Sequence, residues 1–195
     1  LTLDGTINVT VTPGGSFDPG LYRVIGYAGS LTDNGLAVGT VPGGSLVEVQ
    51  TSILGQVNLV NHAGIDVNFW DGGTANDGVV SGGSGLWQGA GGNSHWTLID
   101  GTLNTAYPSD AFAIFSAAAG TVTVDASLGA VNASGLQFAS DGYVITGDAI
   151  GLTGSQSVIR VGDGTTAGAG FTATIAANLT GAGDLFKTDL GTLVL

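Results

Sequence analysis

The chain has 195 residues, of which 43% are hydrophobic and only 9% are charged, and its formal net charge is −12. Three basic residues cannot form the basic patch that binds nucleic acid or an anionic membrane surface, so neither is an expected partner. The absence of cysteine excludes disulfides and cysteine-bound zinc, whereas the hydrophobic content is too high for a disordered chain.

Short segments of alternating apolar and polar residues recur along the chain, each followed by glycine, asparagine or aspartate. This alternation is typical of a strand with one buried face. Strands so short and numerous fit either an antiparallel sandwich or barrel, or a β-solenoid. In chain order, the predicted strands are 6–12, 22–27, 36–41, 46–51, 56–61, 66–70, 96–100, 112–116, 121–126, 136–140, 143–147, 157–162 and 171–176.

The solenoid is favoured by three features. The inward-facing residues are mostly small or branched, as a narrow interior requires, and few hairpin dipeptides flank the strands. Both ends of the sequence read as uncapped hydrophobic strands, so we expect a piece of a longer stacked chain. At about 20 residues per coil, the chain would make about nine or ten coils.

Two stretches interrupt the pattern. Residues 71–93 are rich in glycine and contain only scattered apolar residues, so we predict a loop excursion there. Residues 104–110, which include Pro108, form a second and shorter break.

The last residues carry a motif. The segment "GAGDLFKTDLGTLVL" at 181–195, preceded by "ATIAANLTG" at 173–181, resembles the passenger-associated β-strand repeat of bacterial autotransporters, approximately G-x-L-x-K-x-G-x-G-T-L-x-L. Asp189 stands where that repeat usually has glycine. A looser resemblance covers most of the chain. The matching residues are Gly183, Leu185, Lys187, Gly191, Thr192, Leu193 and Leu195.

The resemblance implies an all-β fold, a right-handed parallel β-helix. It implies that residues 1–195 are a single β-helix fragment of a longer passenger, with a passenger-associated repeat at 173–195. It also implies an extracellular location at the bacterial surface, after export through the outer membrane by a C-terminal barrel that this fragment lacks. That barrel would be the chain's one link to a membrane.

The repeat also makes physical sense by itself. We expect three leucines to point into the core, three glycines to form corners with positive φ, and Lys187 to be solvated on the outer face. The leucines are Leu185, Leu193 and Leu195, and the glycines are Gly181, Gly183 and Gly191.

All three tryptophans fall between positions 70 and 96, around the glycine-rich stretch. One interpretation is a carbohydrate platform, in which aromatic faces stack on sugar rings while acids and amides bind hydroxyls. The alternative, which we favour, is that the tryptophans pin the loop to the rod. The candidate ligand-binding residues are Trp70, Asp71, Asp77, Trp87, His95 and Trp96.

No catalytic residue, metal site or cofactor is predicted. The segment 71–78, "DGGTANDG", invites a calcium site, but it fits neither the EF-hand spacing nor the calcium-binding nonapeptide, and turn chemistry explains it better. Asp71, Asp77, Asp100 and Asp110 could converge as hydrolytic acids, although nothing in the sequence marks a pair.

The predicted function is therefore a non-enzymatic extracellular stalk or adhesin segment. Its expected partners are a host-cell, matrix or glycan surface, or copies of the chain itself end to end. Two alternatives remain open: a self-assembling extracellular fibre or matrix subunit, and a carbohydrate-binding or carbohydrate-cleaving β-helix.

Overall fold

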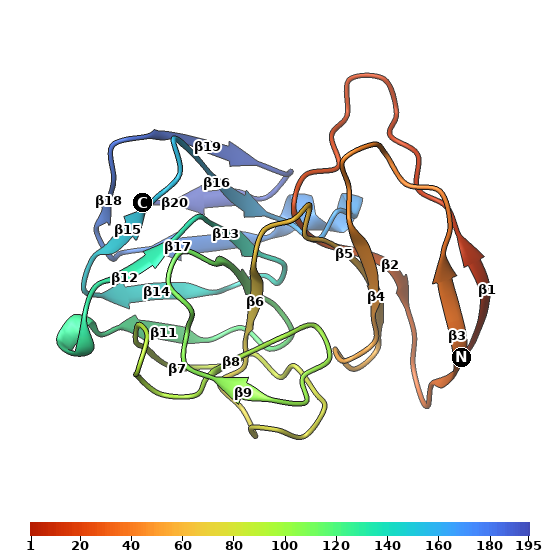
Figure 1. The fold of residues 1–195 in the computed structure, drawn as a ribbon, viewed down its shortest axis with the longest axis horizontal. Helices are drawn as coiled ribbons and strands as arrows, with labels where there is room; N and C mark the ends of the chain where they lie inside the picture. The colour runs from red at the N-terminus through yellow and green to blue at the C-terminus, as the bar shows by residue number, and fades with distance from the viewer.

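The computed structural model describes all 195 residues as an all-β protein with two short 3₁₀ helices, η1 (Ala126–Leu128) and η2 (Thr166–Gly170). From residue 67 onward the strands belong to three sheets, and from residue 112 onward they return to these sheets in a fixed order (Figure 1). A five-stranded sheet contains β7 (Gly85–Trp87), β11 (Thr121–Val124), β14 (Val144–Gly147), β17 (Thr172–Ile175) and β20 (Thr192–Val194). A three-stranded sheet contains β12 (Val131–Ala133), β15 (Ile150–Leu152) and β18 (Leu179–Thr180).

The third sheet has seven strands. Five of them are parallel: β6 (Val67–Trp70), β10 (Phe112–Phe115), β13 (Gly135–Phe138), β16 (Gln156–Val161) and β19 (Asp184–Thr188). Two short strands, β8 (Trp96–Thr97) and β9 (Asn104–Thr105), extend the sheet antiparallel beyond β6. We call these three sheets together the parallel stack.

The register of the parallel stack brings like positions together. Thr123 lies opposite Thr146, 23 residues further along the chain, and Phe115 lies opposite Phe138, with their rings stacked at 5.1 Å. Inward-facing side chains from all three sheets form one buried apolar cluster. Because each rung buries the rung below it, this cluster is continuous along the parallel stack.

The first 61 residues are arranged differently. β1 (Thr2–Ile7) pairs in parallel with β3 (Thr32–Val38), whereas β2 (Gly20–Gly26), β5 (Gln56–Asn61) and β4 (Val47–Gln50) form an antiparallel sheet, which we call the lateral sheet. This sheet differs from the uniform parallel stacking that the sequence predicts. Only residues 51–55 connect β4 to β5, and so short a connection joins antiparallel strands, because parallel strands need a long crossover.

The lateral sheet lies against the outer face of the seven-stranded sheet, beside β6 (Figure 1). A second apolar cluster fills the space between them, with Leu21 and Val60 from the lateral sheet packed near Phe69 and Ile114 from the parallel stack. The seven-stranded sheet is therefore buried on both faces in this region.

Residues 71–93 are mostly outside strands, as a loop would be, but they are not separate from the parallel stack. They contain β7, which pairs in parallel with β11, and the backbone of Gly82 forms bridges with Asp71 and Ala118. The short strand β7 was not predicted, because three residues are too few to show alternation.

The motif at residues 181–195 has mixed outcomes. Leu193 packs against the core, but Leu185 and Leu195 are 41% and 70% exposed, because β19 and β20 are the outermost strands of their sheets. Among the three motif glycines, a positive φ is found only at Gly181, at +145°. Gly191 is needed for space instead, since an added Cβ would lie 2.7 Å from both Cγ1 and the carbonyl oxygen of Val161.

Candidate functional site

The three tryptophans lie inside the protein. Trp70, Trp87 and Trp96 come from β6, β7 and β8, and each is 0% exposed. The Trp87 and Trp96 rings lie 5.1 Å apart between centroids, and the Trp96 ring lies 4.5 Å from that of Tyr107. With no accessible ring face, the three tryptophans cannot stack on a sugar in this structure, so their burial favours the packing interpretation.

The polar candidates around the tryptophans make structural contacts. Asp71 is buried, and its carboxylate accepts hydrogen bonds from the Ser81 N–H and the Asn104 amide, both at 2.9 Å. Asp77 is exposed and accepts a bond from the Val79 N–H in a local turn. His95 packs edge-on against Trp70 at 5.4 Å.

The structure brings no metal-binding group together. No cluster of three or more histidine, aspartate or glutamate side chains occurs in the chain. Asp100 is exposed and accepts hydrogen bonds from the N–H and hydroxyl of Thr102, which hold the pKa of its carboxyl below the ordinary value. Among the four acids considered as a hydrolytic set, Asp71 is buried and hydrogen-bonded by the protein, and Asp77 and Asp100 stabilise local turns. These three carboxylates therefore have structural contacts of their own.

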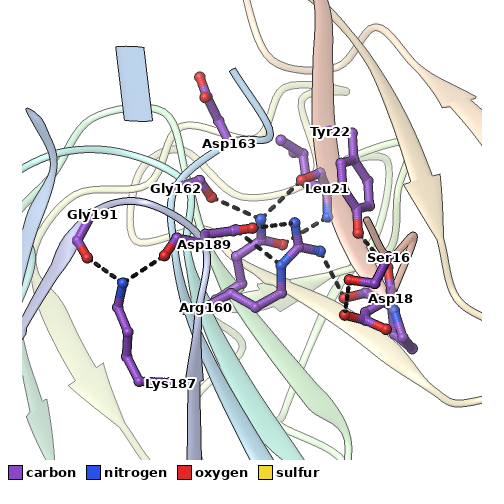
Figure 2. A network of polar contacts seen from close by, with 12 residues as sticks. Ser16, Asp18, Leu21, Tyr22, Arg160, Gly162, Asp163, Lys187, Asp189 and Gly191 are labelled. Atoms are coloured by element: carbon purple, nitrogen blue, oxygen red, sulfur yellow. Dashed lines mark hydrogen bonds and ion pairs between the residues drawn. The ribbon is translucent and has the colours of Figure 1, made fainter. Parts of the chain in front are cut away.

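The most extensive polar site was not predicted. It lies between the lateral sheet and the parallel stack, where Ile114, Gln137 and Arg160 occupy successive rungs of the seven-stranded sheet and face outward. Figure 2 shows Arg160 at this site, between Asp189 and the segment that begins β2. Strand β2 covers them, so Gln137 is 0% exposed and Arg160 is 1% exposed. Gln137 binds the backbone of Leu21 twice: Oε1 accepts from the Leu21 N–H at 2.7 Å, and Nε2 donates to the Leu21 oxygen at 2.9 Å.

Arg160 is the centre of this site. Its Nε and Nη2 donate to the Asp189 carboxylate at 3.0 and 3.3 Å, and its Nη1 donates to the Pro19 oxygen at 2.8 Å. Its guanidinium carbon also lies 4.2 Å from the centroid of the Tyr22 ring, in a cation–π contact. All three guanidinium nitrogens therefore donate hydrogen bonds, two to Asp189 after β19 and one to Pro19 before β2.

The pKa of the Tyr22 hydroxyl is shifted by this environment. Burial raises the pKa of Tyr22 to about 12, the positive charge of Arg160 opposes the rise, and the negative charges of Asp189 and Asp18 add to it. The Tyr22 hydroxyl donates to the backbone carbonyl oxygen of Asp18 at 2.8 Å, and this bond fixes the turn before β2. At this site a neutral phenol is thus stabilised beside a permanent cation.

A second ion pair joins the two parts of the chain. Arg23 on β2 contacts Asp163, which follows β16, at 2.9 Å, and the Arg23 N–H donates to the Asp163 backbone oxygen at 2.7 Å. The Asp163 side chain is 2% exposed and also accepts from the backbone and hydroxyl of Thr165. Both arginines of the chain therefore act in attaching β2 to the parallel stack.

The Asp189 turn explains the departure from the repeat motif. Asp189 has a φ of +62°, the left-handed region that favours glycine, yet its carboxylate is required by Arg160. The prediction that Lys187 lies on the outer face is wrong: Lys187 pairs with the core residue Ile159 and so lies on the inward side of β19, exposed because β19 is the edge strand. Its ammonium group donates to the backbone oxygens of Asp189 and Gly191 and so closes the same turn (Figure 2).

A groove of about 430 Å³ opens beside this site. One wall is the segment 7–12, and the opposite wall is formed by residues 22–24 of β2. The Phe17 ring lies 4.6 Å from the Tyr22 ring between centroids, and exposed threonines line the wall formed by residues 7–12. The groove combines apolar and hydroxyl-bearing side chains and carries one cation, Arg23, which is already paired.

Comparison with known proteins gives one match over the whole chain. The chain is 56% identical over 197 aligned residues to the adhesin BmaC autotransporter of Brucella suis biovar 1 (strain 1330). The alignment covers 100% of this chain but only 6% of that protein, so the chain corresponds to a small segment of its relative. No protein-family model and no solved structure matches the chain.

This similarity supports an autotransporter passenger segment, as the repeat motif predicts. The chain is accordingly exported through the outer membrane to the bacterial cell surface. None of the chain's helices has the length and apolar character needed to span a bilayer.

Sequence reasoning missed the Arg160 site because its contacts join residues 116 and 141 positions apart. One local signal was present. Asp189 stands where the repeat usually has glycine, and its positive φ is strained for a residue with a side chain. Such strain persists where the surrounding contacts hold the residue, so the substitution indicates that the Asp189 side chain has a partner.

Proposed function

We propose that this chain is a non-enzymatic segment of a bacterial surface adhesin. The observation that carries the proposal is the 56% identity, over the full chain, to a segment of a protein named as an adhesin autotransporter. That name also favours a binding role over catalysis. The partner class that we propose is a host-cell or extracellular-matrix surface.

We further propose that the parallel stack is a section of a right-handed parallel β-helix that serves as a rigid stalk. Support comes from strands that return to three parallel sheets in fixed order, with a register of 23 residues per turn at Thr123 and Thr146. Crossovers between parallel strands are almost always right-handed. A stack with a continuous core resists bending, so it would hold attached surfaces away from the cell.

The lateral sheet and the loop before it project from this stalk. We propose that the groove between residues 7–12 and β2 is the adhesive surface, because apolar and hydroxyl-bearing side chains line it together. The buried tryptophans have no part in this proposal.

Self-association end to end is a second candidate function. Leu185 and Phe186 are 41% and 44% exposed on β19, the outermost strand of the seven-stranded sheet, and an unpaired strand edge invites pairing. Sedimentation at several concentrations tests this candidate, since a single species at all concentrations would remove it.

Adhesion is tested by displaying the chain on a non-adherent bacterium and counting attached cells on host monolayers and on matrix-coated plates. We expect attachment above a carrier that displays an unrelated β-protein. The variant Val11→Asp, which places a charge in the groove wall, should reduce attachment, whereas Leu128→Asp, at an exposed site on the far side of the parallel stack, should not. No attachment by the wild-type chain would leave only the stalk role.

A further inference from the structure

Strand β2 is held by residues from three successive rungs of the parallel stack. Gln137 belongs to β13, Arg160 to β16, and Asp189 to the turn that follows β19. Asp189 makes no hydrogen bond to β2 but orients Arg160, which bonds to Pro19 at the start of β2 and lies over the Tyr22 ring. The attachment of the lateral sheet therefore depends on a part of the chain far from it in sequence.

We propose that the lateral sheet is a strap that closes over the parallel stack only when the coil containing β19 and β20 is in place. Docking of the strap and formation of that coil then stabilise each other. The proposal stands on the geometry of the Arg160 site alone and does not rest on adhesion.

The first step of the argument is the cost of covering Arg160. A guanidinium keeps its charge at any pH that a protein survives, and a buried charge without a partner is strongly destabilising. In the docked state Arg160 is 1% exposed, and the Asp189 carboxylate takes two of its donors. Without Asp189 in position, β2 would have to cover an uncompensated charge, so docking becomes unfavourable.

The second step is the reverse dependence. Asp189 occupies a left-handed φ of +62°, which a non-glycine residue adopts at a cost. Two cations hold it there: Arg160 by its carboxylate and Lys187 by its backbone oxygen. Because Pro19, the residue before β2, fixes Arg160 through its backbone oxygen, undocking β2 frees Arg160 to leave the turn. Coupling between two such events is reciprocal.

The third step concerns order. Neighbouring rungs of the parallel stack pair at separations such as 23 residues, whereas β2 reaches Gln137 and Arg160 across 116 and 141 residues. Closing a longer loop costs more entropy, and long-range contacts form later. The contacts of β2 with Gln137 and Arg160 are thus the last contacts of the strap to form, and the Arg160 site makes them conditional on the coil that contains β19 and β20.

Hydrogen exchange, read by peptide mass spectrometry on the full chain, tests the proposal. In Asp189→Asn, which removes the charge and keeps the shape, we expect exchange to accelerate at least about tenfold in peptides of residues 20–61. Peptides of β10, β11, β13 and β14 should exchange as in the wild type. The matched control is Asp184→Asn, which removes the same charge at the exposed start of β19, the strand that precedes the Asp189 turn, away from Arg160.

The reciprocal arm perturbs the strap. Gly20 has a φ of +132°, and a Cβ there would collide with Nη1 of Arg160 and Oε1 of Gln137, so Gly20→Ala should undock β2. We then expect faster exchange at residues 184–194 as well. Gly26→Ala is the control, because the space around Gly26, on the same strand, is open.

Three results would overturn the proposal. The first is wild-type exchange at residues 20–61 in Asp189→Asn. The second is uniform acceleration or loss of folding in that variant, because the parallel stack should fold with the strap undocked. The third is acceleration confined to residues 20–61 in Gly20→Ala, which would show that strap and coil are independent.

Discussion

Asn104 donates a hydrogen bond from its Nδ2 to Oδ2 of Asp71 at 2.9 Å, and both side chains are buried. The other carboxylate oxygen of Asp71 accepts from the Ser81 N–H at 2.9 Å. Asp71 thus ties together segments on either side of β7 and β8, and an aspartate that the sequence marks as a candidate ligand is occupied by the protein itself.

Replacement of Asp71 by alanine should destabilise the chain by about 2–4 kcal/mol, because it leaves a buried N–H and a buried amide without their acceptor. Urea unfolding followed by tryptophan fluorescence measures this change. Asp77→Ala is the control: its side chain closes only an exposed turn, so the expected loss is within about 1 kcal/mol. Equal losses in the two variants would contradict the structural role of Asp71.

The tryptophans offer an internal comparison. Trp70 donates from Nε1 to the Gly83 oxygen at 2.8 Å, whereas Nε1 of Trp96 has no protein acceptor. Both Trp70→Phe and Trp96→Phe leave a cavity, at a cost of about 2–4 kcal/mol, but Trp70→Phe should cost about 1 kcal/mol more because it also orphans a carbonyl. Denaturant midpoints of the two variants test the order, and the reverse order would be inconsistent with the observed contacts.

The strands that sequence alone locates are mainly those of four or more residues, whether one face is buried, as in β11, or both faces are, as in β5. The predicted segment 56–61 coincides with β5, and 121–126 contains β11, because apolar and polar residues alternate there. The strands β12, β15 and β18 have two or three residues and show no period, so the whole three-stranded sheet was missed. At the start of the chain, residues 6–12 were predicted but β1 spans Thr2–Ile7, because Gly5 forms an irregularity that interrupts the alternation.

The candidate site was harder to predict than the strands. Clustered tryptophans indicate a place of high aromatic density, but sequence does not say whether the rings face inward or outward. The Arg160 site depends on β2 folding back over three rungs, and such long-range contacts leave no local pattern. Asp189 is the exception, because its departure from the repeat motif coincides with its positive φ.

The motif glycine at position 191 should be intolerant of any side chain. Gly191→Ala would press a Cβ to 2.7 Å from Val161 Cγ1 and 2.8 Å from the Phe171 oxygen, and we expect a loss of about 1–3 kcal/mol from forced displacement of the core. Gly43→Ala is the control, since nothing lies within 4 Å of its Cβ. Thermal or urea unfolding of both variants measures the difference, and an unchanged midpoint in Gly191→Ala would mean that the last coil is not packed as described.

Alkaline pH should unfold the chain because Tyr107 and Tyr143 are buried and Tyr22 is half-buried. Burial raises the pKa of Tyr22 to about 12 and raises the pKa of Tyr107 and Tyr143 further above the ordinary value of 10.0. Since these folded-state pKa values lie above the unfolded one, their stabilising contribution is complete below pH 10 and is lost as pH rises toward the folded values.

We therefore expect the free energy of unfolding to stay level up to about pH 9.5 and then to fall by up to about 1.4 kcal/mol per pH unit for each of Tyr107 and Tyr143. Urea midpoints across this range measure the slope. Tyr143→Phe loses the bonds to the Ser116 and Ala118 oxygens, so it should be less stable at neutral pH but show a shallower alkaline slope. Tyr27→Phe, at a half-buried ring outside both apolar clusters, serves as the matched control. A wild-type midpoint that does not move between pH 9 and pH 12 would show that the tyrosine hydroxyls are in contact with solvent.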